Sequence, residues 1–362
     1  SCLAEVIAGN LTAADCHDIE GAPFSRLQLF IGALTISGAG PSIDDYSDSS
    51  TSLHAWLGTD NGDGSYTAVL TLPAEAVGTA RFLTSGQAQE RRISDIVLFR
   101  IAQTNGIVID AANADANGVD WDWNNRVRVP IANLARDFSV DGSPLVARRR
   151  PVSDALCNNC HGRLGTASGS NTLANAFHRG ERSTVVACPV CHNPNLASTT
   201  EMTDEPVDGG GVIEPLLPGT SIRMNQSFEF KNMIHGIHAG DYRLTAFVHG
   251  TDDLSGRTQY PALLDNCNKC HQQQSYLFSR GRLGSAVSLE ADPSQRHVFS
   301  PWASSCMGCH DSAAARDHMS NVGGASIGDF TQQEWLAGAV WERCADCHGA
   351  GGSKDVTRVH EI

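Results

Sequence analysis

The chain has 362 residues, 41% of them apolar and 18% charged, which is typical of a folded protein and longer than one compact core usually accommodates. Acidic residues outnumber basic ones 40 to 26, so the formal net charge is -14. This charge argues against nucleic acid and anionic membranes as partners, because both require a basic face. No apolar run is long enough to cross a bilayer, and no signal peptide follows Ser1. We therefore expect a mature or excised chain without a transmembrane segment.

The N-terminal part, residues 1–148, has the pattern of β structure. Short runs rich in β-branched residues alternate with turn clusters, and these runs cover residues 27–31, 66–72, 95–101 and 127–131. Many short strands with polar turns predict a β-sandwich or a small barrel. The triplet Arg148-Arg149-Arg150, followed by Pro151, marks a boundary beyond which the strand pattern ends. We therefore expect two domains, 1–148 and 149–362.

One segment of the first domain resembles the start of a calcium loop. Asn113-Ala-Asp115-Ala-Asn117-Gly118 alternates oxygen-bearing side chains before a glycine, but the twelfth position is Asn124 rather than Glu. A plain Asn/Asp/Gly turn is the preferred interpretation, and a bound calcium ion is the alternative.

Ten of the twelve cysteines fall into five copies of the pattern C-x-x-C-H. The copies are Cys157-Asn-Asn-Cys160-His161 (motif I), Cys188-Pro-Val-Cys191-His192 (motif II), Cys267-Asn-Lys-Cys270-His271 (motif III), Cys306-Met-Gly-Cys309-His310 (motif IV) and Cys344-Ala-Asp-Cys347-His348 (motif V). Two thiols at this spacing reach the two vinyl groups of one porphyrin, and the adjacent histidine binds the iron. Random placement would give about 0.015 such copies. A single copy could be a zinc half-site, but five predict five covalently bound haem c groups.

Haem attachment of this kind takes place outside the cytoplasm, so we expect an exported protein. The two remaining cysteines, Cys2 and Cys16, then favour a disulfide that closes a short loop near the N-terminus. The alternative is that Cys2 is lipidated and Cys16 is free. Cys16-His17 is not a sixth attachment site, because position 13 is Ala.

The second axial ligand of each iron decides between electron transfer and ligand chemistry. Beyond the motif histidines, seven lie in the second domain, and five are needed. His235 and His238 are spaced i and i+3 on a predicted helix, so they share one face. Our choice of distal ligands is His178, His235, His238, His318 and His360. His249 and His297 stand in polar, loop-like contexts and are predicted to be surface residues.

Several segments of the second domain resemble the outer-membrane decahaem cytochromes of metal-respiring bacteria (OmcA/MtrC type). They include Phe230-Lys-Asn-Met-Ile-His-Gly-Ile-His-Ala-Gly240 and residues 188–194, 261–271, 306–319 and 344–360. The family is built as barrel, pentahaem, barrel, pentahaem, and this chain is similar to one such pair, most of all the C-terminal pair. The resemblance implies an α+β multidomain fold. It consists of an all-β split barrel of Greek-key type, followed by a mostly helical or irregular pentahaem domain.

The leading functional hypothesis is an electron carrier whose five bis-histidine haems relay electrons to external acceptors. By resemblance the acceptors are metal oxides or flavins, which would make the protein a terminal metal or flavin reductase at the cell's outer surface. The partners would be other multihaem cytochromes or copies of itself. One alternative is a subunit of a cytochrome filament, with His54, His249 or His297 binding a neighbour's iron. The other is a multihaem oxidoreductase with one open haem.

Overall fold

The computed structural model describes residues 133–161, 164, 178, 182–207, 210–256, 258–277, 284–338 and 341–360. Before residue 133 it describes 26–34, 46–54, 59–61, 66–67, 78–90, 120–121 and 127–130. The predicted Cys2–Cys16 disulfide, the predicted strand 95–101 and the calcium alternative at 113–118 lie outside these ranges.

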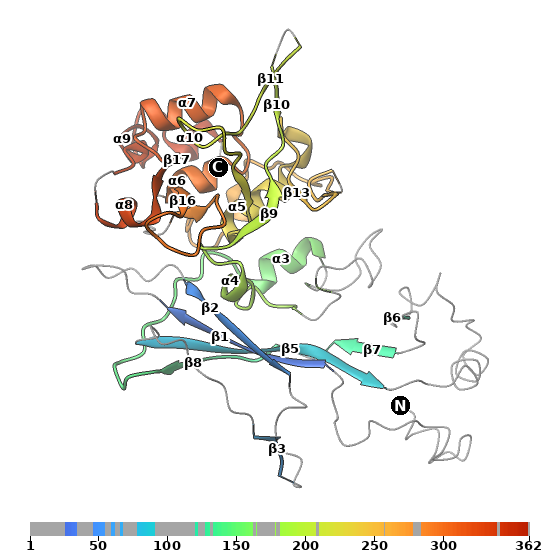
Figure 1. Cartoon of the computed structure of the whole chain (residues 1–362). Coiled ribbons are helices and arrows are strands. Elements are labelled where there is room, and N and C mark those ends of the chain that lie inside the picture. Colours follow the sequence, from blue (N-terminus) through green and yellow to red (C-terminus); the bar gives the residue numbers. More distant parts are fainter. Residues whose placement is uncertain are drawn as a thin grey trace, which may run out of the picture.

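An antiparallel sheet of six strands forms the described N-terminal part (Figure 1). Its strands are β1 (Arg26–Leu34), β2 (Tyr46–His54), β5 (Thr79–Glu90), β6 (Asp120–Trp121), β7 (Val127–Pro130) and β8 (Ala135–Ser139), and a separate pair joins β3 (Thr59–Asp60) to β4 (Tyr66–Thr67). The order is β2-β1-β5-β7-β6, and β8 pairs with the first half of β5. Within the described residues this path does not close on itself, so the split barrel stays a prediction.

Strand β5 holds the sheet together because it pairs along one edge with β1 and along the other with β8 and then β7. Strands β1 and β7 cover two of the predicted runs, and β4 covers only the first two residues of a third. Strand β2 was not predicted, because its sequence, Tyr-Ser-Asp-Ser-Ser-Thr-Ser-Leu-His, lacks the apolar alternation of a half-buried strand.

The C-terminal part contains short helices joined by turns. They are α3 (Asp154–His161), α4 (Cys188–Cys191), α5 (Phe230–His238), η4 (Gly240–Tyr242), η5 (Cys267–Lys269), α6 (Pro301–Cys306), α7 (Ala313–Asn321), α8 (Gln332–Leu336), α9 (Cys344–His348) and α10 (Val356–Val359). In Figure 1, α3 and α4 lie between the six-stranded sheet and the remaining helices. The longest described helices have nine residues, and none of the helices in the described ranges is long and apolar enough to span a membrane.

Short strands also occur in this part, which corrects the expectation that strand structure ends at the boundary. They are β9 (Ala197–Glu201), β10 (Glu205–Val207), β11 (Gly211–Ile213), β12 (Asn225–Ser227), β13 (Val248–His249), β14 (Asp252–Asp253), β15 (Ser285–Ala286), β16 (His297–Phe299) and β17 (Ile327–Thr331). Strands of two to five residues escape pattern analysis because they are too short to show an alternation. The β10–β11 hairpin projects from the end farthest from the large sheet (Figure 1).

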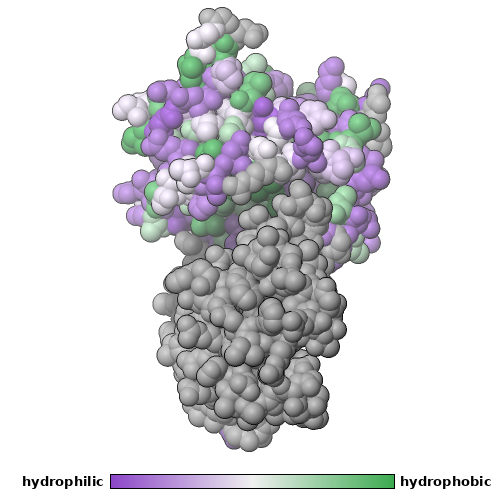
Figure 2. All heavy atoms as spheres, turned by 90° about the vertical axis from the view of Figure 1, so that its right-hand side faces the viewer, coloured by the Kyte–Doolittle hydropathy of each residue, from purple (hydrophilic) through white to green (hydrophobic). Residues whose placement is uncertain are grey.

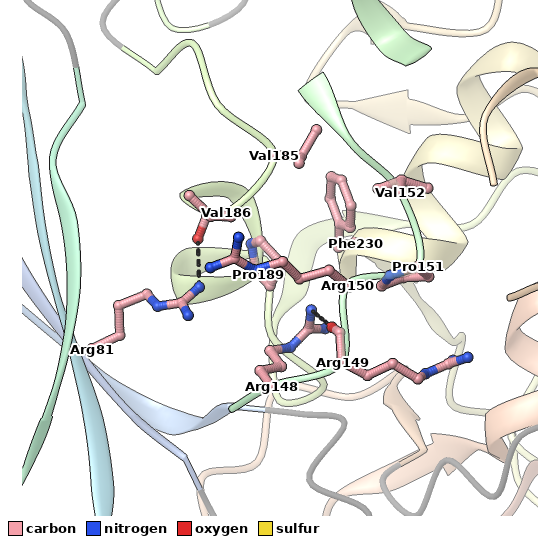
Figure 3. Close-up of a pocket in the computed structure, with 10 residues that line it drawn as sticks. All are labelled: Arg81, Arg148, Arg149, Arg150, Pro151, Val152, Val185, Val186, Pro189 and Phe230. Atoms are coloured by element: carbon pink, nitrogen blue, oxygen red, sulfur yellow. Dashed lines mark hydrogen bonds between the residues drawn. The ribbon is translucent and has the colours of Figure 1, made fainter. Parts of the chain in front are cut away.

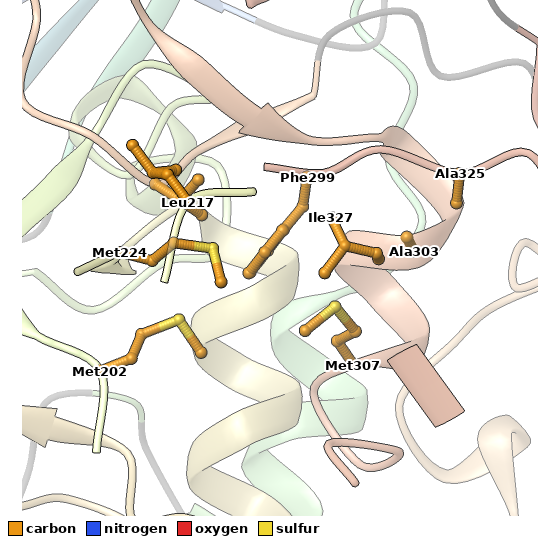
Figure 4. Close-up of a cluster of buried hydrophobic side chains, with 9 residues drawn as sticks. Met202, Leu217, Met224, Phe299, Ala303, Met307, Ala325 and Ile327 are labelled. Carbon is orange, nitrogen blue, oxygen red and sulfur yellow. The ribbon is translucent and has the colours of Figure 1, made fainter. Parts of the chain in front are cut away.

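Buried side chains form a core in the C-terminal part. Figure 4 shows the main cluster, whose nine buried members are Met202, Leu217, Met224, Val287, Phe299, Ala303, Met307, Ala325 and Ile327. Met307 lies inside motif IV, so this core fixes one attachment site directly. A second cluster joins Phe228, Met233 and Phe247 beneath α5. On the face shown in Figure 2, the coloured residues are mainly hydrophilic with scattered apolar residues.

The six-stranded sheet packs directly against motif II. Leu83 of β5 forms a buried cluster with Ala187 and Val190, which are 0–2% exposed. Arg81 of the same strand binds Asp137 of β8 through two hydrogen bonds of 2.6 and 2.8 Å and donates to the carbonyl of Val186. The sheet and the segment leading into motif II therefore share one interface.

Candidate functional site: five pairs of imidazoles

Each motif contains a single helical turn that brings its two cysteines and its histidine together. The backbone N–H of the histidine donates to the carbonyl of the first cysteine in motifs II, III and IV, at 2.8, 2.9 and 2.8 Å. Residues three and four positions apart on a helix lie on the same face. The two thiols therefore face one side, with the imidazole next to them.

Every motif histidine stands opposite one further imidazole. The ring centroids are 6.0 Å apart for His161 and His238, 6.0 Å for His192 and His178, 6.1 Å for His271 and His235, 6.2 Å for His310 and His360, and 6.1 Å for His348 and His318. A metal–imidazole bond of about 2.0 Å, extended by roughly 1.1 Å to the ring centre on each side, separates two rings on one metal ion by about 6.2 Å. The five spacings fit a single metal ion held between each pair.

Helix α5 supplies the second imidazole to two pairs. His235 and His238 are three residues apart on this helix and face the histidines of motif III and motif I respectively. The Glu229 side chain caps the N-terminus of α5 by accepting from the backbone N–H groups of Lys231 and Asn232. A rigid, capped helix thus fixes the separation between two of the sites.

A close contact at Gly308 holds α5 against motif IV. A Cβ atom on Gly308 would lie 2.2 Å from the Cβ of His235, so no larger residue fits there without displacement of the helix. The Asn232 side chain donates to the carbonyl of Ser304 at 2.9 Å, and Nδ1 of His235 lies 3.2 Å from the carbonyl of Ser305. Contacts with the motif IV segment therefore position His235, the imidazole that faces His271 of motif III.

The Nδ1 atoms of the paired histidines face hydrogen-bond acceptors in most cases. Backbone carbonyls accept from His192, His235, His238, His348 and His360 at 2.9–3.2 Å, and the hydroxyl of Ser275 lies 3.2 Å from His271. A proton on Nδ1 leaves the lone pair of Nε2 for a metal ion, as metal-bound histidines require. The tautomer set by these contacts fits iron ligation.

Burial favours the neutral form of several of the paired imidazoles. Burial lowers the pKa of His235 to about 4, with a smaller effect of nearby His238, and lowers the pKa of His271 to about 4, with a smaller effect of His235. Burial also lowers the pKa of His161, His192 and His310. Only neutral imidazole binds a metal ion, so the ligands need not lose a proton at neutral pH.

His178 differs from the other paired histidines. Its Nδ1 accepts a hydrogen bond of 2.7 Å from Arg182, since a guanidinium can only donate. Its backbone has φ of +52°, a left-handed conformation that is uncommon for residues other than glycine. Burial, followed by the charge of Arg182, lowers its pKa to about 3. This pair matches the others in spacing but not in the hydrogen bond that sets the tautomer.

The last two partner imidazoles lie at or near capped helices. His318 is on α7, whose first turn is capped by the hydroxyl of Ser312, and His360 ends α10, whose N-cap is Asp355. The predicted surface histidines do not face a motif histidine in the described residues. Nδ1 of His249 lies 3.2 Å from the Ser198 hydroxyl, and Nδ1 of His297 lies 2.8 Å from the carbonyl of Gly328.

Comparison with known proteins identifies the family of the chain. A family model described as outer membrane cytochrome MtrC/MtrF-like, domains II/IV, matches residues 149–361. The chain belongs to this family. The resemblance to outer-membrane multihaem cytochromes is thereby confirmed, and the family implies c-type haem as the cofactor.

Two further comparisons add little information about the chain. No curated protein matches the chain. Among solved structures, MtrC from Shewanella baltica OS185 aligns with 17% identity and a TM-score of 0.36, over 81% of this chain and 35% of that one. The chain thus spans about a third of the length of that cytochrome.

Burial favours the neutral S–H form of several motif thiols. Burial raises the pKa of Cys188, Cys306 and Cys344 to about 12, and that of Cys157 and Cys309 to about 11. A structural zinc site needs about four converging side chains, and among the described residues no three His, Cys, Asp or Glu side chains converge on one point. The site chemistry is that of paired imidazoles beside thiols.

A buried ion pair stabilises the backbone of motif IV. The side chains of Arg243 and Asp311 are each 4% exposed and approach within 3.5 Å, and Arg243 also donates to the carbonyls of Met307 and Gly308. Asp311 accepts from the backbone N–H groups of Leu244 and Thr245 at 3.1 and 2.8 Å. Sequence analysis missed both residues, because a charged residue beside a motif carries no pattern that distinguishes it from a surface charge.

Proposed function

We propose that this chain covalently carries five haem c groups, each with two histidines on its iron, and that it transfers electrons between them. The proposed proximal ligands are the motif histidines, and the distal ligands are His178, His235, His238, His318 and His360. The observation that carries the proposal is the spacing of 6.0–6.2 Å in all five imidazole pairs. The ten motif cysteines form the thioether bonds.

When bound, haem supplies a one-electron couple whose potential depends on its axial ligands, burial and hydrogen bonds. The chain holds each pair of imidazoles at the separation that one iron needs, so little rearrangement accompanies binding. With both axial positions taken by protein, substrates have no access to the iron. The oxidoreductase alternative needs one open iron, and the partner imidazole opposite each of the five motif histidines argues against it. Motif II is the site at which this alternative would apply, because the Nδ1 of its partner His178 accepts a hydrogen bond from Arg182.

Contacts between the motif segments support a linear order of haems. Asp154 at the start of α3 accepts from Thr184 and from the backbone N–H of Val185, just before motif II. His238 and His235 of α5 face the histidines of motifs I and III, and Gly308 of motif IV contacts His235. Glu342, just before motif V, accepts from Ser300 and from the backbone N–H of Trp302 at the start of α6, the helix that ends at Cys306 of motif IV. The motifs therefore follow one another in space as II, I, III, IV, V. We infer that electrons pass along this order, with motifs II and V at the ends.

Our proposals on location and partners rest on the family. We propose that the protein works at the outer membrane surface or outside the cell, and that it passes electrons to flavins or metal oxides or to other multihaem cytochromes. The N-terminal sheet contacts the motif II end of the proposed order, which fits a spacing or docking module. The division at residue 148, the Greek-key split barrel, the Cys2–Cys16 disulfide and the calcium alternative stay predictions.

Two measurements test the proposal. The intact mass of the purified holoprotein gives the number of attached haems, which we expect to be five. Stopped-flow oxidation of the fully reduced protein by a soluble flavin, and separately by a suspended ferric oxide, reports whether all haems communicate. We expect five electrons per chain to reach the acceptor without a trapped fraction. Fewer haems, or a fraction that stays reduced in both assays, would contradict the proposal.

A further inference from the structure

The planes of the paired imidazoles meet at different angles. They are perpendicular for His161 and His238, at 90°, and nearly so for His318 and His348, at 85°. The other three pairs are tilted by 33–51°. Because all five centroid spacings lie between 6.0 and 6.2 Å, the angle is the feature that distinguishes motifs I and V from the rest.

The angle between the planes affects the iron, because each axial imidazole interacts with the iron d orbital that lies across its ring plane. Two parallel rings raise the energy of the same d orbital, whereas two perpendicular rings raise different orbitals and leave them nearly equal in energy. Low-spin ferric haem with parallel rings therefore gives a rhombic spectrum in electron paramagnetic resonance, and perpendicular rings give a single feature at large g. Parallel rings also stabilise the ferric state more, so perpendicular rings raise the midpoint potential, which depends on the axial ligands.

Helix α5 fixes the backbone that carries His238. Its first residue, Phe230, lines a small space together with Val152 and with Pro189 of motif II (Figure 3). The helix also packs against the buried cluster of Phe228, Met233 and Phe247. The freedom that is left to His238 is the rotation of its own side chain.

A hydrogen bond to a backbone carbonyl does not by itself make a pair perpendicular. Nδ1 of His238 lies 2.9 Å from the carbonyl of Ile234, and a carbonyl accepts over a broad range of directions. Backbone carbonyls also face Nδ1 of His235 and His360, yet the pairs that contain these two residues are tilted by 33° and 51°. A second contact is therefore needed to hold the ring of His238.

Tyr260 supplies a contact at the side of this ring. Its own ring lies edge-on to the imidazole of His238, with centroids 5.9 Å apart and planes at 85°. A glycine makes the approach possible. A Cβ atom on Gly240 would lie 2.4 Å from the carbonyl oxygen of Ser255 and 3.2 Å from that of Thr258, so this turn packs closely against the end of α5. Tyr260 follows the turn directly and is thereby brought to the imidazole.

We propose that Tyr260 is a positioning residue that holds the imidazole of His238 perpendicular to that of His161. The proposal rests on the five-haem function, in which these two imidazoles bind the iron at motif I. The edge contact blocks rotation of the ring toward a parallel arrangement and so keeps the haem at motif I easier to reduce. Tyr276 makes the same contact with His271, at 5.9 Å and 82°, in a pair tilted by 33°. The contact thus preserves the orientation of an imidazole rather than imposing one angle.

Electron paramagnetic resonance of the oxidised, full-length holoprotein tests the proposal. In the wild type we expect large-g features from two haems, one for each perpendicular pair. His238→Ala assigns one of them to motif I, because that haem becomes high-spin and its large-g feature disappears. Tyr260→Leu should remove the same feature and replace it with a rhombic low-spin signal. Five haems should remain attached, and one midpoint potential should fall.

Two further tyrosine variants serve as controls. Tyr260→Phe keeps the ring edge and should retain the wild-type spectrum and potentials, which separates packing of the ring from any role of the hydroxyl. Tyr276→Leu removes the matching contact at motif III, so both large-g features should remain.

The outcomes separate this inference from the function beneath it. A wild-type protein with fewer than five haems, or a His238→Ala protein whose haems all stay low-spin, would defeat the proposed function. If His238→Ala behaves as expected but Tyr260→Leu keeps the feature assigned to motif I, Tyr260 does not hold the angle. Five low-spin haems without large-g features in the wild type, loss of the motif I feature in Tyr276→Leu, or loss of a haem from Tyr260→Leu would also overturn the positioning role.

Discussion

The imidazoles of His161 and His238 face each other at a centroid distance of 6.0 Å, with their planes perpendicular, although 77 positions separate them in sequence. His238 is fixed by the rigid helix α5, and its Nδ1 lies 2.9 Å from the carbonyl of Ile234 in the preceding turn. The pair shows how two segments that are distant in sequence come together at one of the proposed iron sites.

Removal of a distal histidine should open one haem and leave four unchanged. We expect His238→Ala to produce one high-spin ferric signal in electron paramagnetic resonance and carbon monoxide binding to one haem after reduction, because the vacated axial position admits water or gas. His249→Ala is the matched control, since His249 faces no motif histidine. A low-spin spectrum that persists in His238→Ala would contradict this ligand assignment.

A methyl group at Gly308 should disturb a different site from the motif that contains it. The new Cβ would meet the Cβ of His235 at 2.2 Å, and neither the helix backbone nor that atom can rotate away. We expect Gly308→Ala to displace His235 and to give one high-spin haem with all five haems still attached. Asn159 occupies the equivalent position of motif I and is exposed, so Asn159→Ala should produce no high-spin haem. Equal spectra for the two variants would contradict the proposed contact.

The buried ion pair between Arg243 and Asp311 should carry a large share of the stability around motif IV. Asp311→Ala leaves a guanidinium buried without its carboxylate, and such losses cost about 3–5 kcal/mol. The exposed pair Arg343–Asp346, with side chains 73% and 66% exposed, provides the contrast. Asp346→Ala should cost less than about 1 kcal/mol. Denaturant unfolding followed by circular dichroism measures both, and similar losses in the two variants would refute the distinction.

The buried Glu342 carboxyl should make the protein less stable as pH rises from 4 to 7. Burial raises its pKa, against the lowering effect of hydrogen bonds from Ser300, Ala303 and Trp302 at the start of α6. A carboxyl whose pKa is higher in the folded state contributes stability below its unfolded pKa, and this contribution is lost as pH rises through the folded value. The free energy of unfolding should therefore fall less between pH 4 and pH 7 in Glu342→Gln than in the wild type.

Unfolding in urea at several pH values tests this expectation. The exposed Glu290 supplies a control, because Glu290→Gln should follow the wild-type pH dependence. If Glu342→Gln and the wild type lose stability in parallel over this range, the buried carboxyl is not responsible.

The sequence contains the five attachment motifs and suggests five candidate distal histidines, and the structure places each candidate opposite a motif histidine. The sequence does not show which candidate faces which motif. His235 and His238 share a helix face, yet they face motifs III and I, and this division follows from the packing of α5 against Gly308. The Nδ1 contacts are tertiary and leave no local pattern. The left-handed backbone of His178 is likewise invisible in a sequence without a glycine or a turn signal at that position.

The strands were harder to predict from the sequence than the attachment motifs. Strand β2 is mostly polar, and its place in the sheet depends on pairing with β1 rather than on an apolar alternation of its own. The apolar runs of β1 and β7, by contrast, carry enough β-branched residues to be identified without tertiary information.

The central claim, five closed bis-histidine haems, is tested most directly by electron paramagnetic resonance of the oxidised wild-type holoprotein together with carbon monoxide addition after reduction. We predict low-spin signals that account for five haems per chain and an absorbance spectrum that carbon monoxide does not change. A high-spin signal accompanied by carbon monoxide binding would show that at least one iron lacks its second histidine. It would contradict the pairing on which this account of the protein depends.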